Sequence, residues 1–299
     1  MLKLDRVTKV YKIGTFGGTT LTAVRDVSFD LRPGEVVSLI GESGSGKSTV
    51  GKMILRLTPV TDGSISFEGT DVSTLERRRL KGYHGNVQGV FQDPFSSYNP
   101  IFKIDRVFSM IRGAYLSGMS GSDWSRKLDA SLHAVSLEPE AVLGKYPHQL
   151  SGGQLQRLLI ARALLLDIKY LVADEIISML DASTRIDVLN LLGDLKARGL
   201  GVLFITHDLS LGNYISERTV ILRRGSVVEM GATEKVFGNP MHPYTKLLIA
   251  SVPHLHKKWE QVEQEVGVPD ERAISEPGDV PLLQEVEDDH LVALGPDAP

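Results

Sequence analysis

The chain has 299 residues, of which 42% are hydrophobic and 23% are charged, and a formal net charge of −4 at pH 7, as expected for an ordinary globular protein. This charge balance does not favour nucleic acid as the main partner, and the absence of cysteine excludes disulfides, thiolate metal sites and cysteine nucleophiles. Residues 1–6 lack the apolar core of a signal peptide, and no apolar run reaches the roughly 18 residues of a membrane-spanning helix.

Two kinds of strand are predicted along the chain. Alternating apolar and polar residues predict antiparallel strands at residues 2–10, 23–31 and 64–67. Turns are expected at Pro33-Gly34 and Asp62-Gly63. Short, continuously apolar runs predict buried parallel strands at residues 35–40, 170–173 and 201–206. Polar residues follow each buried run, at the edge where a parallel sheet binds its ligands.

A phosphate-binding loop follows the first buried strand and leads into a predicted helix. Glycines in such a loop let successive backbone N–H groups turn inward around a polyphosphate, because side chains would block the close approach. Lys47 would then reach the outer phosphates, and the Ser48 hydroxyl would ligate Mg²⁺. The nucleotide-binding residues expected here are Gly41, Ser43, Gly44, Ser45, Gly46, Lys47, Ser48 and Thr49.

From residue 92 to residue 150 the apolar residues adopt helical spacing, which predicts an inserted helical subdomain over about residues 93–167. Ser122 is expected to cap a helix from Asp123 to Ala134. Further helices are expected at residues 104–117, 153–166, 183–198 and 242–251. The last of these begins with Pro243, at a position that favours proline.

Asp174 and Glu175 follow the buried run at residues 170–173. Asp174 would hold the metal, and Glu175 would polarise the water that attacks the γ-phosphate. By itself, a strand that ends in Asp-Glu more often simply reaches the surface. The phosphate-binding loop earlier in the chain reverses that balance and favours a catalytic pair.

The stretch from Leu150 to Gln154, Leu-Ser-Gly-Gly-Gln, resembles the signature motif of the ABC ATPases. A serine hydroxyl and glycine N–H groups at a helix N-terminus form an anion site that suits a γ-phosphate. Alone, the motif would be no more than a helix cap, but its position between the phosphate loop and the Asp-Glu pair makes it specific. The expected nucleotide contacts are Ser151, Gly152, Gly153 and Gln154.

The resemblance covers about residues 1–251 and implies roles for four more residues. Tyr11 matches the aromatic residue that stacks on adenine, and Gln92 matches the glutamine that senses the metal and the attacking water. Asp181 matches the loop that communicates across the ATPase dimer, and His207 matches the switch histidine that contacts the γ-phosphate.

The resemblance also implies the architecture, which is an α/β fold. We expect a P-loop NTPase ABC ATPase core with a mixed central sheet, an antiparallel β subdomain and the inserted α-helical subdomain. Residues 1–251 would form the ABC nucleotide-binding domain, and residues 252–299 an acidic, partly flexible C-terminal extension. Because the signature of one subunit closes over the phosphate loop of another in this family, a dimer is implied.

Residues 91–100 and 239–245 resemble the ATPases of oligopeptide, dipeptide and nickel importers. This resemblance implies an ATP-hydrolysing subunit that uses ATP and Mg²⁺ and lies peripherally on the cytoplasmic face of the inner or plasma membrane. Its partners would be a second, non-identical ABC ATPase, two transmembrane permeases and, indirectly, an extracytoplasmic solute-binding protein, with no nucleic acid. Residues 83–98 would form part of the groove for a permease helix.

Three alternatives remain open at this point. The same motor could serve an oligosaccharide or nickel importer, or the chain could be a soluble ABC ATPase that acts on nucleic acid or ribosomes. It could also be a regulatory subunit with slow turnover, because Ile176-Ile177 stands where the family commonly has Pro-Thr.

The C-terminal extension of many relatives carries a cysteine cluster, and without cysteine no iron–sulfur cluster is expected here. Residues 257–278 are expected to form a flexible linker or appendage. Residues 281–293 resemble the end of such extensions.

Overall fold

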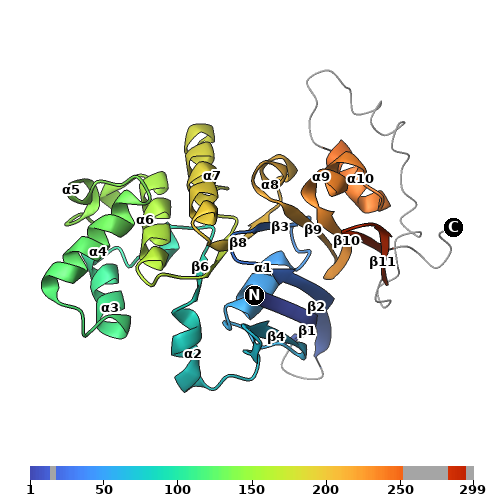
Figure 1. The fold of residues 1–299 in the computed structure, drawn as a ribbon, viewed down its shortest axis with the longest axis horizontal. Coiled ribbons are helices and arrows are strands. Elements are labelled where there is room, and N and C mark those ends of the chain that lie inside the picture. Colours follow the sequence, from blue (N-terminus) through green and yellow to red (C-terminus); the bar gives the residue numbers. More distant parts are fainter. Residues whose placement is uncertain (14–17, 252–281, 294–299) are drawn as a thin grey trace. The chain divides into compact units, whose positions relative to one another are not determined.

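The computed structural model describes residues 1–13, 18–251 and 282–293, and the chain divides into two compact units (Figure 1). The first unit combines residues 1–75 with the chain from residue 203 onward, and the second consists of residues 76–202. The second unit is therefore an insertion between the two sequence segments that form the first.

An antiparallel sheet in the first unit has the strand order β2-β1-β4-β5. Its strands are β1 (Leu2–Ile13), β2 (Thr19–Leu31), β4 (Asp62–Phe67) and β5 (Thr70–Asp71). The three predicted antiparallel strands are confirmed, each with bounds a few residues wider. The turn at Pro33-Gly34 is present, but the turn predicted at Asp62-Gly63 is wrong, because these residues begin β4 and Asp62 pairs with Thr8 across a bulge.

The first unit also contains strands of a mixed sheet in the order β11-β12-β10-β9-β3. These strands are β3 (Val36–Ile40), β9 (Arg218–Arg223), β10 (Ser226–Ala232), β11 (Leu283–Glu287) and β12 (His290–Ala293). β3 pairs with β9 in parallel, whereas β10 pairs with both β9 and β12 antiparallel. The predicted mixed sheet is therefore confirmed.

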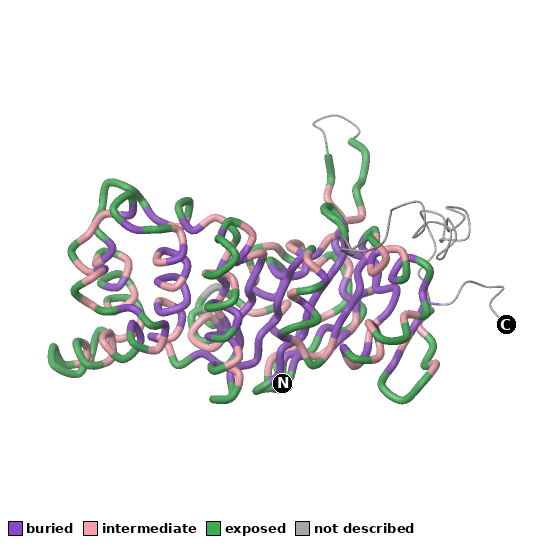
Figure 2. Tube along the Cα trace, turned by 90° about the horizontal axis from the view of Figure 1, so that it is seen from above, coloured by how far each residue is buried: buried purple, intermediate pink, exposed green. Residues whose placement is uncertain are grey.

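Among the described residues of the first unit, four helices lie between or after these strands in the sequence. They are α1 (Lys47–Ile54), α8 (Leu209–Ile215), α9 (Thr233–Gly238) and α10 (Pro243–Ala250). The prediction for α10 is confirmed, with His242 as its N-cap and Pro243 at its first position. Buried Ile40, Ile221, Val236 and Tyr244 share one apolar cluster that joins β3 and β9 to α9 and α10. Buried positions gather along the strands and on the inner sides of the helices (Figure 2).

The second unit is mainly helical. Its helices are α2 (Arg77–His84), α3 (Asp105–Tyr115), α4 (Gly121–His133), α5 (Pro139–Val142), α6 (Gly152–Leu164) and α7 (Ala182–Ala197). Strand β6 (Val87–Val90) pairs in parallel with β7 (Tyr170–Asp174), and β8 (Gly201–Thr206) begins at the end of this unit. None of the helices in the described part of the chain has the length and apolar character of a membrane span.

The cap predicted for helix α4 is wrong by two residues. Ser120, not Ser122, caps the helix, since the Ser120 hydroxyl accepts a hydrogen bond from Asp123 N–H at 3.1 Å. Ser120 and Asp123 have the spacing of a serine cap followed three residues later by an acid, which supplies two acceptors at the helix start. Ser122 instead lies within the first turn, with its hydroxyl 3.0 Å from that of Ser120.

The end of the chain adds a hairpin to the mixed sheet. Strands β11 and β12 pair with each other, and β12 pairs antiparallel with β10, where Gly231 lies opposite His290. This hairpin coincides with the segment 281–293 that resembles the end of importer ATPase extensions. The linker expected at residues 257–278 lies outside the described residues.

Candidate functional site

The phosphate loop connects β3 to α1 in the first unit. Lys47 is 4% exposed, and its Nζ donates hydrogen bonds to the carbonyl oxygens of Gly41 at 2.7 Å and Glu42 at 2.8 Å. Gly46 has φ +105°, and a Cβ at this position would lie 2.4 Å from the carbonyl oxygen of Ala23, so only glycine fits. The Lys47 ammonium is therefore held by backbone carbonyls of the loop itself.

Helix α1 starts at Lys47 with Gly46 as its N-cap and with no side-chain hydrogen bond to the cap. The N–H groups of its first turn thus have no side-chain oxygen from the cap residue as an acceptor, which suits an anion. Ser48 and Thr49 lie in this first turn. The predicted loop residues thus lie together in one contiguous stretch of the chain between β3 and the first turn of α1.

Tyr11 and His207 also lie in the first unit. Tyr11 is half-buried on β1, where the Lys9 ammonium lies 5.0 Å from the centroid of its ring. His207 is exposed directly after β8, and the next residue, Asp208, caps helix α8. Both side chains reach solvent, as contact with a nucleotide requires.

In the second unit, the pairing of β6 with β7 brings Gln92 and the Asp-Glu pair to one sheet edge. Val90 at the end of β6 lies opposite Ala173 on β7. Gln92 is exposed two residues beyond β6, Asp174 ends β7 with 7% exposure, and Glu175 follows it half-buried. These residues are about eighty positions apart in the sequence, and the parallel pairing places them at the same carboxyl edge.

The backbone at Glu175 is strained, since its φ of +50° lies in the left-handed region. Such strain in a non-glycine residue is commonly found at functional sites. Ile176 and Ile177, which follow, are only 1% and 3% exposed. The departure from Pro-Thr therefore places two apolar side chains in the core of this unit.

The signature residues begin helix α6. Ser151 is the N-cap and forms a reciprocal capping box, in which its hydroxyl accepts from Gln154 N–H at 3.2 Å and its N–H donates to Gln154 Oε1 at 2.9 Å. Ser151 is exposed, Gly152 is half-buried and Gly153 is buried. The motif is thus a helix cap and also presents a hydroxyl at a helix N-terminus, the arrangement that suits an anion.

Asp181 caps helix α7 in the same unit. Its carboxylate accepts hydrogen bonds from the Ser183 hydroxyl at 2.6 Å, from Thr184 N–H at 3.0 Å and from the Thr184 hydroxyl at 2.8 Å. These bonds, that of Ser183 first, hold the pKa of Asp181 well below its usual range. The Asp181 carboxylate, at the end of the loop before α7, therefore stays ionised.

The residues expected to hold a metal are Ser48 in the first unit and Gln92 and Asp174 in the second, and their hydroxyl, amide and carboxylate oxygens are hard ligands of the kind that Mg²⁺ prefers. Within the described ranges, no group of three or more His, Cys, Asp or Glu could hold a metal. Mg²⁺ needs no such group, because it is usually bound by one or two protein oxygens together with phosphates and water.

The phosphate loop has supports that the sequence did not reveal. Glu42 N–H donates to the Tyr244 hydroxyl at 3.1 Å, and Gly225 N–H donates to the Ser45 carbonyl at 2.9 Å. Tyr244 lies in the segment 239–245, whose family resemblance does not indicate this contact. A contact between residues 202 positions apart leaves no signal in a local pattern.

The histidine that caps α10 makes the stability of the fold depend on pH. Burial, with Arg223 nearby, lowers the pKa of His242 to about 4, although Glu229 opposes the shift. The unfolded chain takes up this proton near pH 6.5. The stability that neutral His242 contributes is therefore fully present above pH 6.5 and is lost as the pH falls from there toward 4.

We expect His242→Asn to weaken this dependence, because asparagine caps helices well and does not titrate. The free energy of unfolding of the unmodified protein should fall between pH 7 and pH 5 by about 2 kcal/mol more than that of the variant. Urea unfolding at the two pH values measures the difference. Substitution of the exposed His148 by asparagine is the control, and a pH dependence equal in all three proteins would refute the assignment.

Comparison with known proteins places these elements in a family context. Residues 24–178 match the family model described as ABC transporter, and residues 228–278 match the one described as oligopeptide/dipeptide transporter, C-terminal region. The first match contains the phosphate loop, Gln92, the signature and the Asp-Glu pair. Tyr11 and His207 lie outside both.

Three curated relatives show similar identity but different coverage. A Brucella ovis protein, provisionally named a peptide import ATP-binding protein, is 42% identical over 236 residues, which are 78% of this chain and 74% of the relative. The peptidoglycan transport ATP-binding protein of Agrobacterium fabrum is 43% identical over 79% of this chain and 45% of its own length. The glutathione import ATP-binding protein of Salmonella typhi is 44% identical over 77% of this chain and 37% of its own length.

Solved structures agree with these matches. A dimeric ATP-binding cassette in a post-hydrolysis state, bound to ADP and phosphate, is similar with a TM-score of 0.69 and 31% identity, over 78% of this chain and 99% of its own. The cbiO1 protein of Clostridium perfringens, part of an ABC transporter complex, has a TM-score of 0.68 over 80% of this chain and 90% of its own. At 23% identity, the second shows a common fold only.

Proposed function

Because this chain belongs to the ABC transporter family, we propose that it is the ATP-binding and ATP-hydrolysing subunit of an importer for oligopeptides or dipeptides. The observation that carries the proposal is the phosphate loop, which holds Lys47 over its own carbonyls at the start of α1. The C-terminal match to oligopeptide and dipeptide transporters supports the solute class.

In the proposed reaction, the phosphate loop binds the nucleotide while Tyr11 stacks on adenine. Glu175 accepts the proton of the attacking water, and His207 contacts the γ-phosphate. Ser48, Gln92 and Asp174 are the residues that would hold Mg²⁺, and a bound Mg²⁺ would supply positive charge to the phosphates. Residues 1–251 form the nucleotide-binding domain in this proposal, and residues 252–299 the extension.

The signature residues act on a second subunit in this proposal. Ser151 and the following glycines close over the phosphate loop of a partner ATPase, a non-identical one, so that each site needs two chains. The dimeric state of the solved cassette supports this expectation. Two permeases would anchor the pair at the cytoplasmic face of the membrane, with an extracytoplasmic solute-binding protein as an indirect partner.

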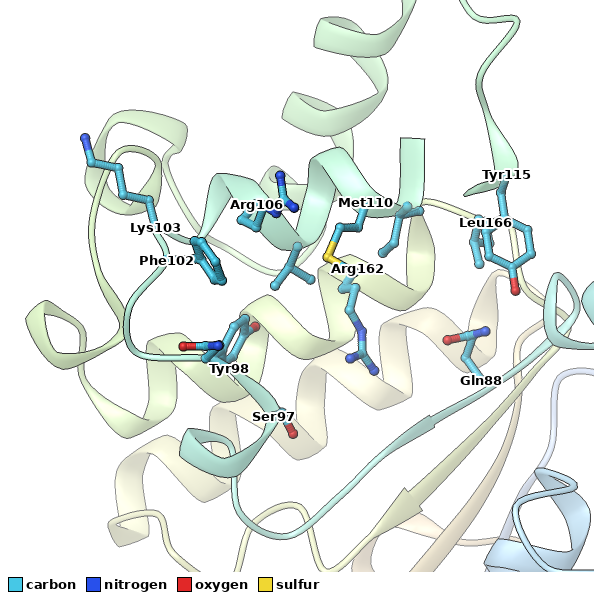
Figure 3. A pocket seen from close by; sticks show the side chains of 13 residues that line it. Gln88, Ser97, Tyr98, Phe102, Lys103, Arg106, Met110, Tyr115, Arg162 and Leu166 are labelled. Carbon is cyan, nitrogen blue, oxygen red and sulfur yellow. The ribbon is translucent and has the colours of Figure 1, made fainter. Parts of the chain in front are cut away.

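A groove in the second unit suits a permease segment. It has a volume of about 620 Å³ and is lined by side chains of β6, of residues 97–99 and 102–103, of α3, of the last turn of α6 and of Leu166 just beyond it (Figure 3). Tyr98, Phe102 and Met110 supply apolar walls, and Lys103 and Arg106 supply positive charge (Figure 3). Met110 is 62% exposed and Phe102 is 47% exposed, which is costly unless a partner covers them. An apolar permease helix with acidic flanking residues would fit these walls.

Met110→Asp is expected to lower the recovery of permeases by roughly tenfold or more, since it places a charge where an apolar contact worth about 1.5–3 kcal/mol would form. Affinity purification from membranes measures the recovery, and ATP binding by the variant should be unchanged. Leu57→Asp, at a 60% exposed position of the first unit, is the control. Equal recovery of permeases with both variants would exclude the groove as the docking site.

The proposed function as a whole is tested by purifying tagged Glu175→Gln protein from membranes with Mg-ATP. Recovery of two permeases and a second ATPase is the expected result, and the attached solute-binding protein would identify the solute. Recovery of only soluble proteins or nucleic acid would favour an ABC ATPase that acts on nucleic acid or ribosomes.

The names of the relatives favour an amide-linked solute. Peptide and glutathione, named for two of them, share this chemistry, whereas nickel does not. An oligosaccharide importer remains the second candidate, because a cytoplasmic ATPase does not touch the solute. Transport assays with the recovered complex separate the two.

A further inference from the structure

The C-terminal helix α10 touches the phosphate loop directly. The Tyr244 hydroxyl accepts the hydrogen bond from Glu42 N–H at 3.1 Å, and the carbonyl of the same residue, Glu42, accepts from Lys47 Nζ and from Ser45 N–H at 3.1 Å. The Tyr244 ring is 1% exposed, with the Arg223 guanidinium 4.8 Å from its centroid. Tyr244 therefore holds Glu42, the residue whose carbonyl accepts hydrogen bonds from two other residues of the loop.

The start of α10 is held in turn by a buried carboxylate on β10. Glu229 is fully buried, and its two oxygens accept from Met241 N–H at 2.9 Å and from His242 N–H at 3.0 Å. The His242 Nδ1 accepts from Tyr244 N–H at 3.0 Å. Since burial keeps His242 neutral at pH 7, this nitrogen retains its lone pair for the bond.

The C-terminal hairpin completes the same network. His290 on β12 is fully buried, and its Nε2 lies 2.8 Å from Glu229 Oε1. The hairpin can approach this closely because Gly231 lies opposite His290, and a Cβ on Gly231 would be 2.3 Å from the carbonyl oxygen of Asp289. In Figure 1, β10, β11, α9 and α10 lie together at this end of the first unit.

We propose that Tyr244 is a positioning residue for the phosphate loop and that the docked C-terminal hairpin keeps it in place through Glu229. The path runs from His290 to Glu229, from there to the N–H groups of residues 241 and 242, then through the His242 imidazole to Tyr244, and finally to Glu42. A loop held in its binding conformation loses less freedom when phosphate binds, so the hairpin raises nucleotide affinity. The inference rests on ATP binding as proposed above.

Tyr244→Phe tests the first step, because it removes one oxygen and leaves the ring. We expect the Kd for Mg-ATP, measured by titration calorimetry on the full chain, to rise by roughly threefold to tenfold, as for loss of one hydrogen bond. Tyr214→Phe, at a 60% exposed position on α8, should bind ATP like the unmodified protein. If Tyr244→Phe only lowers the melting temperature and leaves the Kd unchanged, Tyr244 is merely structural and the inference is wrong.

Gly231→Ala tests the hairpin, because the added methyl group forces it away from β10 without touching the loop or Tyr244. The Kd should rise in the same direction, by roughly twofold or more. Gly238→Ala is the matched control, since its Cβ would meet nothing within 4 Å. If Gly231→Ala binds Mg-ATP with unchanged affinity, the hairpin does not act on the phosphate loop.

ATP titration of Lys47→Ala beside Tyr244→Phe distinguishes a chain that does not bind ATP from one in which Tyr244 does not position the loop. If the unmodified chain binds Mg-ATP no better than Lys47→Ala, the proposed function itself fails. If the unmodified chain binds and Tyr244→Phe binds equally well, only the positioning role fails.

Discussion

Glu175→Gln is expected to abolish ATP hydrolysis and leave ATP binding intact. The amide keeps the shape of the carboxylate but cannot accept a proton from water, and general-base catalysis of this kind typically contributes about 10²–10⁴-fold in rate. Glu175 emerges from β7 in a strained left-handed backbone conformation, and glutamine bears the same strain as glutamate, so the fold should survive. Bound ATP should then persist and hold two ATPase subunits together.

Phosphate release and ATP titration measure the two expected effects, and light scattering detects the ATP-dependent dimer. Glu140→Gln, at an exposed position on α5, is the control and should hydrolyse ATP normally in the same assembly. If Glu175→Gln still hydrolyses ATP, Glu175 is not the general base. That result would also favour the alternative of a regulatory subunit, which Ile176-Ile177 first suggested.

Lys47→Ala is expected to abolish productive nucleotide binding. Its ammonium is almost fully buried at the loop and would exchange the carbonyls of Gly41 and Glu42 for phosphate oxygens. A hydrogen bond to a charged group contributes about 1.5–3 kcal/mol, and Lys47 can make more than one. We therefore expect the Kd for Mg-ATP to rise by roughly 100-fold or more.

Titration calorimetry measures this loss, and Lys52→Ala, at an exposed position near the end of the same helix, is the control. The melting temperature without nucleotide shows whether the loop fold survives the removal of the buried ammonium. A Lys47→Ala protein that still folds and binds Mg-ATP with unchanged affinity would exclude the assigned role.

Local sequence patterns predicted much of the candidate site. The phosphate loop, the Ser151 cap and the end of β7 were placed correctly, because each depends on a few consecutive residues and on the period of a strand or helix. Errors arose where two local signals competed, as at Ser120 and Ser122, or where a strand of only four residues, β6, was too short for its period to be recognised. The roles of the site residues remain predictions.

The family, the class of fold and the residues expected to bind phosphate could all be recognised from short motifs, since each motif has a chemical reason for each residue type. Which distant residues meet became clear only from the folded chain. The parallel pairing of β6 and β7 brings Gln92 to the edge where Asp174 lies, and the hairpin pairing with β10 brings His290 to Glu229. Tyr244 reaches Glu42 across 202 positions for the same reason. Such contacts depend on the order and the register of the strands, and no local sequence pattern specifies either of them.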